Sequence, residues 1–201
     1  MNKKIIALFC GSFNPPLFSH FSLAEQLLNS NKNIEKIIFI PVSNKYNKEG
    51  LISDMHRFNM LNLVCENNPK FEVSNIEFNS PRQPFTFETL QAMQKIYPEH
   101  ELRLIIGTDN LKELETWYEI EQLLSSFNVY VLARDEDNIE EIISGHALLS
   151  KYSSSFVKSN ISIRTNLSSS FIRNEIKNNN NVRYLLPNEV IEYIKKNNLY
   201  L

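Results

Sequence analysis

The sequence predicts an α/β fold, a Rossmann-like open parallel sheet with helices on both faces (three-layer αβα), followed by C-terminal helices from about residue 166. Short apolar runs that are typical of buried strands alternate with helical patterns almost from end to end. Three of the four glycines, Gly11, Gly50 and Gly107, end such runs or lie in the loop that follows, where parallel sheets bind ligands. Because we find no linker or repeat, we expect a single domain over residues 1–201.

The expected elements follow one another in regular alternation. Apolar and alternating runs predict strands over residues 3–10, 35–42, 71–78, 101–107 and 128–133, with a weaker final strand over 159–165. Ser53 and Ser168 are good N-caps, and Pro187 suits a first helical turn. Helical periodicity predicts helices over residues 20–29, 55–65, 86–97, 109–125 in two pieces around Trp117, 139–151, 168–177 and 187–198.

Composition excludes several classes of protein. A net charge of −2 and a pI of about 6.1 do not favour binding of a nucleic-acid polymer. No apolar run reaches the roughly 18 residues of a membrane span, and the start lacks the cleavage site of a secretory signal. Cys10 and Cys65 have neither metal-ligand spacing nor disulfide density, so we expect buried free thiols in a reducing cytoplasm. The oligomeric state stays open, with a homo-oligomer among the options.

The first apolar run ends in a stretch suited to phosphate. Gly-Ser-Phe-Asn-Pro over residues 11–15, followed by His20, places backbone N–H groups, a hydroxyl, an amide and an imidazole at one helix N-terminus. Anions bind there because first-turn N–H groups lack partners and the helix dipole favours negative charge. The chain lacks both G-x-x-x-x-G-K-[ST] and a G-x-G-x-x-G after the first strand. A P-loop enzyme and a classical dinucleotide oxidoreductase are therefore disfavoured.

A second stretch, Leu-Ser-Ser-Ser-Phe-Ile-Arg over residues 167–173, completes a pair. Together the two resemble the signatures of nucleotidyltransferases named for an H-x-G-H motif. Within that superfamily the chain is most similar to the nicotinate/nicotinamide mononucleotide adenylyltransferases. Further similar stretches occur in order along nearly the whole chain, at residues 41–48, 56–61, 85–90, 106–109 with Trp117, and 182–187.

The resemblance implies an enzyme that transfers AMP from ATP to nicotinate or nicotinamide mononucleotide and releases pyrophosphate, a step of NAD biosynthesis. Mg²⁺ would arrive on the triphosphate, and the 5′-phosphate of the mononucleotide would attack the α-phosphorus in line. Catalysis would then consist mainly of positioning and charge neutralisation. Two alternatives stay open: a nucleotide-binding paralogue with impaired catalysis, and a phosphopantetheine adenylyltransferase, although such enzymes are typically shorter.

By the same resemblance, the catalytic residues would be His20, Lys48 and Arg173. Serines at the second helix start would hold phosphate together with the guanidinium of Arg173, which suits bidentate contact. Lys48 could equally be a solvated loop cation, and Arg134 could pack on adenine or form a surface ion pair. The full implied ATP-binding set is Gly11, Ser12, Phe13, His20, Arg134, Ser168, Ser169, Ser170 and Arg173.

The pyridine and ribose would lie on the other side of the site. Trp117 is either a stacking partner for a cationic pyridine ring or a core aromatic. The side chains of His56 and Arg57 are expected to be structural, and no residue of the chain is expected to ligate a metal directly. The implied mononucleotide-binding set is Asn14, Lys48, Thr86, Gly107, Asp109 and Trp117.

The chain departs from the family pattern at one point. Where many bacterial members have His-x-Gly-His, residues 17–20 read Leu-Phe-Ser-His. Leu17 stands in place of the first histidine, and Ser19 stands in place of the small residue. Eukaryotic-type members of the family also lack the first histidine. Since leucine donates no hydrogen bond, we expect slower turnover than in a relative with both histidines.

Overall fold

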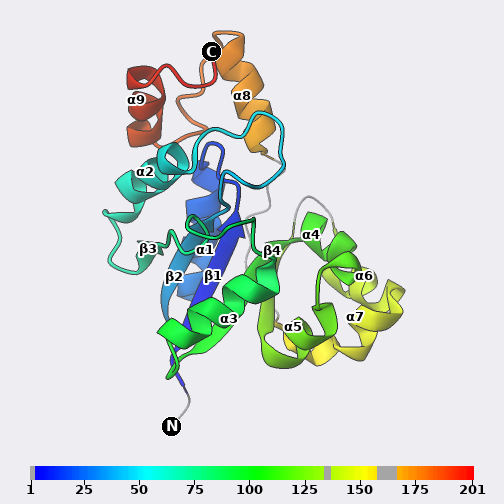
Figure 1. Ribbon diagram of the computed structural model, residues 1–201. Helices are drawn as coiled ribbons and strands as arrows, with labels where there is room; N and C mark the ends of the chain where they lie inside the picture. Colours follow the sequence, from blue (N-terminus) through cyan, green and yellow to red (C-terminus); the bar gives the residue numbers. More distant parts are fainter. Residues whose placement is uncertain (1–2, 134–136, 158–166) are drawn as a thin grey trace.

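A computed structural model describes residues 3–133, 137–157 and 167–201 (Figure 1). Within these residues six strands form one sheet, paired in parallel in the order β3-β2-β1-β4-β5-β6. The strand order reverses between β1 and β4, so the crevice outside their carboxyl ends is the place where such sheets bind ligands. The strands are β1 (Ile5–Gly11), β2 (Ile34–Pro41), β3 (Phe71–Val73), β4 (Glu101–Gly107), β5 (Asn128–Leu132) and β6 (Phe156–Val157).

Helices cover both faces of the sheet, which confirms the predicted fold class. Alternate residues of β1 enter different cores, because successive side chains of a strand point to opposite faces. Ile5 and Ala7 pack with α1 (Phe18–Ser30) and α2 (Asp54–Cys65). Ile6 and Leu8 pack with the helices of the opposite face. These are α3 (Thr86–Ile96), α4 (Thr108–Glu113), α5 (Ile120–Ser126), α6 (Ile139–Gly145) and α7 (Ala147–Lys151), with 3₁₀ turns at Leu114–Thr116 and Ser153–Ser155.

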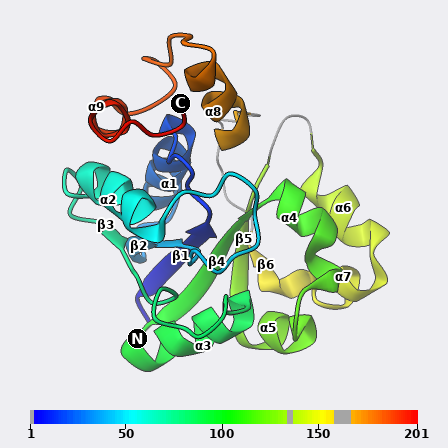
Figure 2. The same ribbon diagram turned by 45° about the horizontal axis from the view of Figure 1, so that its top comes forward.

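The last two helices form a separate apolar cluster beyond the carboxyl edge of the sheet. α8 (Ser169–Lys177) and α9 (Asn188–Lys196) follow the sheet, and α9 lies beside α2 (Figures 1 and 2). Leu17, at the start of α1, is buried in this cluster. The C-terminal helices therefore pack against the loop that follows β1.

Two helices begin at other residues than predicted. α1 begins at Phe18, two residues early, because His20 accepts a hydrogen bond at Nδ1 from the backbone N–H of Leu17 (2.9 Å). This contact supplies the cap that the Leu17 side chain lacks. α9 begins at Asn188, so Pro187 precedes the first turn instead of lying in it.

Two predicted elements are wrong in extent. The strand predicted over 71–78 ends at Val73, because Ser74 Oγ accepts from the N–H of Ile76 (3.4 Å) and the chain turns. The helix predicted over 139–151 breaks into α6 and α7 at His146, whose backbone is extended and whose ring pairs with Glu115 (3.1 Å). The strand predicted over 159–165 lies outside the described residues. No helix among the described residues is long and apolar enough to cross a membrane.

Candidate active site

The loop that follows β1, residues 11–17, is called the β1 turn below. Its Phe13 has a φ of 45°, and the Asn14–Pro15 peptide bond is cis. The ring of Phe13 folds back over Gly11, where a Cβ atom would lie 3.2 Å from the ring. A side chain at position 11 would therefore need the Phe13 ring to shift, so glycine suits this close approach.

The side chain of Arg57 binds the backbone of the β1 turn. Its guanidinium donates hydrogen bonds to the carbonyls of Ser12 (3.0 Å), Ile52 (3.1 Å) and Val42. The side chain is fully buried, and burial lowers its pKa from the ordinary value. Three backbone segments thus share one guanidinium, which confirms the structural role predicted for Arg57.

The second signature meets the β1 turn directly. Ser168 caps α8 by accepting a hydrogen bond from the N–H of Phe171 (3.2 Å). Ser169 Oγ donates to the carbonyl of Pro15 (2.8 Å), 154 positions away. Arg173 donates from Nη1 to the carbonyl of Asn14 (2.9 Å) and from Nη2 to Ser170 Oγ (3.1 Å). The N-terminus of α8 is therefore fixed against the β1 turn.

A third segment, residues 43–51 after β2, is called the Lys48 loop. Lys48 Nζ donates to Ser12 Oγ (3.3 Å), and Asn14 Nδ2 donates to the carbonyl of Gly50 (2.8 Å). Partial burial and the nearby positive charge of Arg173 lower the pKa of Lys48, while Asp109 opposes that shift. Cationic groups from two distant segments therefore converge on the β1 turn.

His20 lies in the first turn of α1 beside the same loop. Its ring packs edge-on against Phe13 (ring centroids 5.1 Å apart) and Phe9 (5.9 Å). Because Nδ1 accepts from Leu17, a neutral His20 carries its proton on Nε2. The ring is thus held as a donor through Nε2.

The end of β4 forms the other side of the crevice. Gly107 precedes α4, and Asp109 is exposed in the first turn of that helix. Thr108 Oγ1 donates to Asp137 (2.6 Å), which also pairs with Lys112 (2.7 Å) and ties α4 to the residues just before α6. The backbone at the carboxyl end of β4 is thereby fixed.

Thr86 and Trp117 lie near a pair of stacked aromatic rings. Thr86 is the first residue of α3, and Trp117 is half-buried against the core on that face. The rings of the residues next to them, Phe85 and Tyr118, stack with centroids 4.5 Å apart and are each 47% exposed. The sequence analysis missed this pair, although each member adjoins a predicted site residue.

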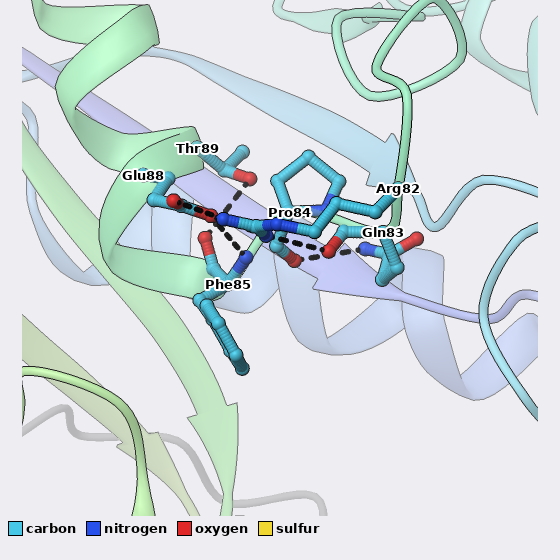
Figure 3. Close-up of polar contacts among 6 residues, drawn as sticks. All are labelled: Arg82, Gln83, Pro84, Phe85, Glu88 and Thr89. Atoms are coloured by element: carbon cyan, nitrogen blue, oxygen red, sulfur yellow. Dashed lines mark hydrogen bonds and ion pairs between the residues drawn. The ribbon is translucent and has the colours of Figure 1, made fainter.

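The start of α3 is stabilised by a local charge contact (Figure 3). Arg82 donates two hydrogen bonds to Glu88 (2.9 and 2.6 Å), and Glu88 also accepts from the N–H of Phe85 (2.8 Å). Both contacts lower the pKa of the exposed Glu88 carboxyl. This capping contact joins residues that are near neighbours in sequence.

Beneath this start lies a buried carboxyl group that the sequence analysis also missed. Glu77 accepts hydrogen bonds from Thr89 Oγ1 (2.7 Å) and Gln83 Nε2 (2.6 Å), and burial raises its pKa. Gln83 in turn accepts from the N–H and hydroxyl of Ser43. The network links the Lys48 loop to the loop before α3. Its only sequence signal was an acidic residue in an apolar stretch.

The structure thus gathers most of the predicted residues at the carboxyl edge of the sheet. Arg134 lies outside the described residues. Among the described ranges, no three or more His, Cys, Asp or Glu side chains are grouped so as to hold a metal ion. Hydrogen bonds within the site involve Ser12, Asn14, Lys48, Ser169, Ser170 and Arg173. Next to these residues in the sequence lie Gly11, Phe13 and Ser168, and the ring of His20 packs against Phe13. The other predicted residues, Thr86, Gly107, Asp109 and Trp117, come from α3, the end of β4 and the segment that follows it.

Comparison with known proteins agrees with this arrangement. A model of cytidylyltransferase-like proteins matches residues 8–175. A probable nicotinate-nucleotide adenylyltransferase of Carboxydothermus hydrogenoformans is 36% identical over 197 residues, which cover 97% of each sequence. Another, from Flavobacterium psychrophilum, is 33% identical over 97% of this chain and 98% of the relative. The chain belongs to the nicotinate-nucleotide adenylyltransferase family.

The fold of this family member also matches a solved structure. Plasmodium falciparum nicotinic acid mononucleotide adenylyltransferase, complexed with NaAD, superposes with a TM-score of 0.80 at 23% identity. The match covers 98% of this chain and 97% of that chain. The C-terminal helices are therefore part of the shared fold.

The departure from the family motif at Leu17 has a structural explanation. Its side chain is 1% exposed and packs with residues of α8 and α9, among them Ile172 and Val190. A histidine with this side-chain direction would place an imidazole in an apolar cluster, which is costly without a hydrogen-bond partner. Leu17 therefore joins the β1 turn to the C-terminal helices.

Proposed function

We propose that this protein transfers the adenylyl group of ATP to nicotinate mononucleotide and releases pyrophosphate, forming the dinucleotide for NAD biosynthesis. The observation that carries the proposal is the contact between the two signatures, in which Arg173 donates to the carbonyl of Asn14. Relatives 36% and 33% identical over nearly their whole length are named as probable nicotinate-nucleotide adenylyltransferases. The substrate choice within the mononucleotides rests on those names.

On the ATP side, the chain supplies positive charge and backbone donors and no covalent nucleophile. His20, with its proton on Nε2, donates to phosphate near the α-phosphorus, together with the backbone of Gly11, Ser12 and Phe13. The ammonium of Lys48 neutralises charge that develops as the P–O bond breaks. The β- and γ-phosphates take the second set of contacts, from Ser168, Ser169, Ser170 and Arg173, and Arg134 is assigned to adenine.

The metal enters with the substrate. ATP is bound as its Mg²⁺ complex, because phosphate oxygens and water are the ligands that Mg²⁺ prefers. Divalent charge on the triphosphate reduces the negative charge that the attacking phosphate of the mononucleotide meets. Lys48 and Arg173, which contact the β1 turn, act on the same charge.

On the mononucleotide side, Asp109 and the backbone at Gly107 accept the ribose, while Thr86 and Trp117 contact the pyridine. A half-buried Trp117 offers one ring face to a flat cationic ring, which favours aromatic contact. Asn14 contributes through the Lys48 loop, whose Gly50 carbonyl its amide already binds. The two substrates would meet in line above the carboxyl ends of β1 and β4.

We further propose that residues 1–201 act as one domain located in the cytoplasm. The contacts of Ser169 and Arg173 with the β1 turn support the first point, since the C-terminal part completes the site. The free thiols of Cys10 and Cys65 support the second. A homo-oligomer and the lack of a nucleic-acid partner stay predictions.

A pyrophosphate-release assay tests the proposed function. Purified protein with Mg²⁺ and ATP should release pyrophosphate with nicotinate mononucleotide, more slowly or not at all with nicotinamide mononucleotide, and not with phosphopantetheine. The variant His20→Ala should lose at least about a hundredfold in kcat, as expected for a removed transition-state donor. ATP binding by calorimetry with no release from any substrate would instead identify a catalytically impaired paralogue.

A further inference from the structure

Tyr200, in the segment after α9, contacts the β1 turn. Its hydroxyl donates a hydrogen bond to Asn14 Oδ1 (2.8 Å), across 186 positions of sequence. Burial raises the pKa of this phenol, although Arg173 and Arg57 oppose the shift, so the hydroxyl stays protonated as the donor. The contact therefore persists throughout the ordinary pH range.

The Asn14 amide is held at both ends. The carbonyl of Gly50 can only accept, so it takes the NH₂ group of Asn14, which donates to it (2.8 Å). The amide oxygen then faces Tyr200, whose hydroxyl donates to it and holds the amide in this orientation. Gly50 follows Lys48 by two residues in the same loop, so this hydrogen bond ties the loop backbone near the lysine to the β1 turn.

The backbone of the segment after α9 fixes the direction of the Tyr200 side chain. Leu199 is buried among the apolar residues of α2, α8 and α9, and its N–H bonds to the carbonyl of Ile194 (3.1 Å). Tyr200 has a φ of 66°, a left-handed conformation that a non-glycine residue adopts only when its surroundings hold it there. The anchored neighbour and the unusual backbone together direct the ring at Asn14.

We propose that Tyr200 is a positioning residue, which acts through Asn14 to hold the Lys48 loop closed over the β1 turn. This inference rests on the proposed function for its effect on rate, because the role of Lys48 on phosphate belongs to that proposal. Its effect on the loop does not depend on turnover. Tyr200 itself touches no reacting atom.

Limited digestion with trypsin tests the loop without substrates. Cleavage after Lys45 and Lys48, identified by mass spectrometry, should be about fivefold faster in Tyr200→Phe than in the unaltered protein, the factor expected for one lost hydrogen bond. The matched control is Tyr193→Phe, which removes a hydroxyl bonded to His56 and Asn59 between α9 and α2. It should leave cleavage in the Lys48 loop within twofold. Equal cleavage in both variants would overturn the proposal.

Kinetics separates positioning from general destabilisation. Tyr200→Phe should lower kcat/KM about fivefold in the unaltered protein but less than twofold in a Lys48→Met background, because the lysine that it positions is gone. Tyr193→Phe should change kcat/KM less than twofold in both. A loss from Tyr200→Phe that persists undiminished without Lys48 would contradict the positioning role. If no substrate turns over, the proposed function is wrong, but the digestion still tests whether Tyr200 holds the Lys48 loop in place.

Discussion

The two sides of the crevice are held in different ways. On the proposed ATP side, the β1 turn bonds to Ser169 and Arg173, 154 and 159 positions distant, and to the buried Arg57. On the proposed mononucleotide side, the start of α3 is held by contacts that are close in sequence: the exposed Arg82–Glu88 pair, six positions apart, and beneath it the hydrogen bonds of Glu77 with Gln83 and Thr89, six and twelve positions apart. Stabilising charge in phosphoryl transfer requires hydrogen-bond donors that are already in position before the reaction. Binding of the flat pyridine ring depends less on such exact placement. The β1 turn is thus held by contacts between distant segments, and the start of α3 mainly by contacts within one segment.

Among variants that test this contrast, Arg57→Met is expected to have the largest effect, on stability. Three backbone carbonyls would lose the buried donor that they share, so the free energy of unfolding should fall by about 3 kcal/mol. Urea unfolding measures it. Arg82→Met, which removes a guanidinium from the exposed side, is the matched control and should change unfolding little. Similar losses for the two arginines would remove the contrast.

Arg173→Ala should have the second largest effect, on the rate of catalysis. It removes the charge at the N-terminus of α8, and kcat/KM for ATP should fall by about 10²–10³, or about 2.7–4 kcal/mol of transition-state stabilisation. Steady-state pyrophosphate release measures the loss. Arg183→Ala, an exposed arginine between α8 and α9, should cost less than twofold. Arg173→Lys should recover only part of the rate, since lysine lacks the planar fork.

Phe85→Ala should have a smaller effect, confined to the mononucleotide side. Losing the stack on Tyr118 should raise the KM for nicotinate mononucleotide by about two- to tenfold, the worth of one aromatic pair. The KM for ATP should stay within twofold. An equal rise in both KM values would show that the two sides are coupled more closely than their contacts indicate.

The smallest effect is a change in pH dependence. The pKa of Lys48 is lowered, and the ammonium is lost as pH rises through that pKa, so kcat/KM should fall on the alkaline side below the ordinary lysine value of 10.5. Lys48→Arg should move this alkaline limb to higher pH, because guanidinium stays charged. An unchanged limb would exclude Lys48 as its source.

Sequence patterns predicted the fold well where the signal was local. The N-caps Ser53 and Ser168 lie where expected, and strand 101–107 was predicted with the bounds of β4. Prediction failed where a contact outside the pattern prevailed, as when Glu115 engaged His146 and α6 ended early. Alternation over 71–78 indicated a strand, but only residues 71–73 form one, and the later residues enter a turn that contains the buried Glu77.

The sequence alone determined the order of elements, the two signatures and the family they resemble, because periodicity, capping and motif spacing act over a few residues. Only the tertiary structure decided that Arg57 supports the β1 turn and that Tyr200 orients Asn14. It also gave Leu17 its place in an apolar cluster, where the motif alone indicated only a missing histidine. These contacts join segments far apart in the chain, and no local pattern records which distant side chain will fill a cavity or satisfy a buried carbonyl.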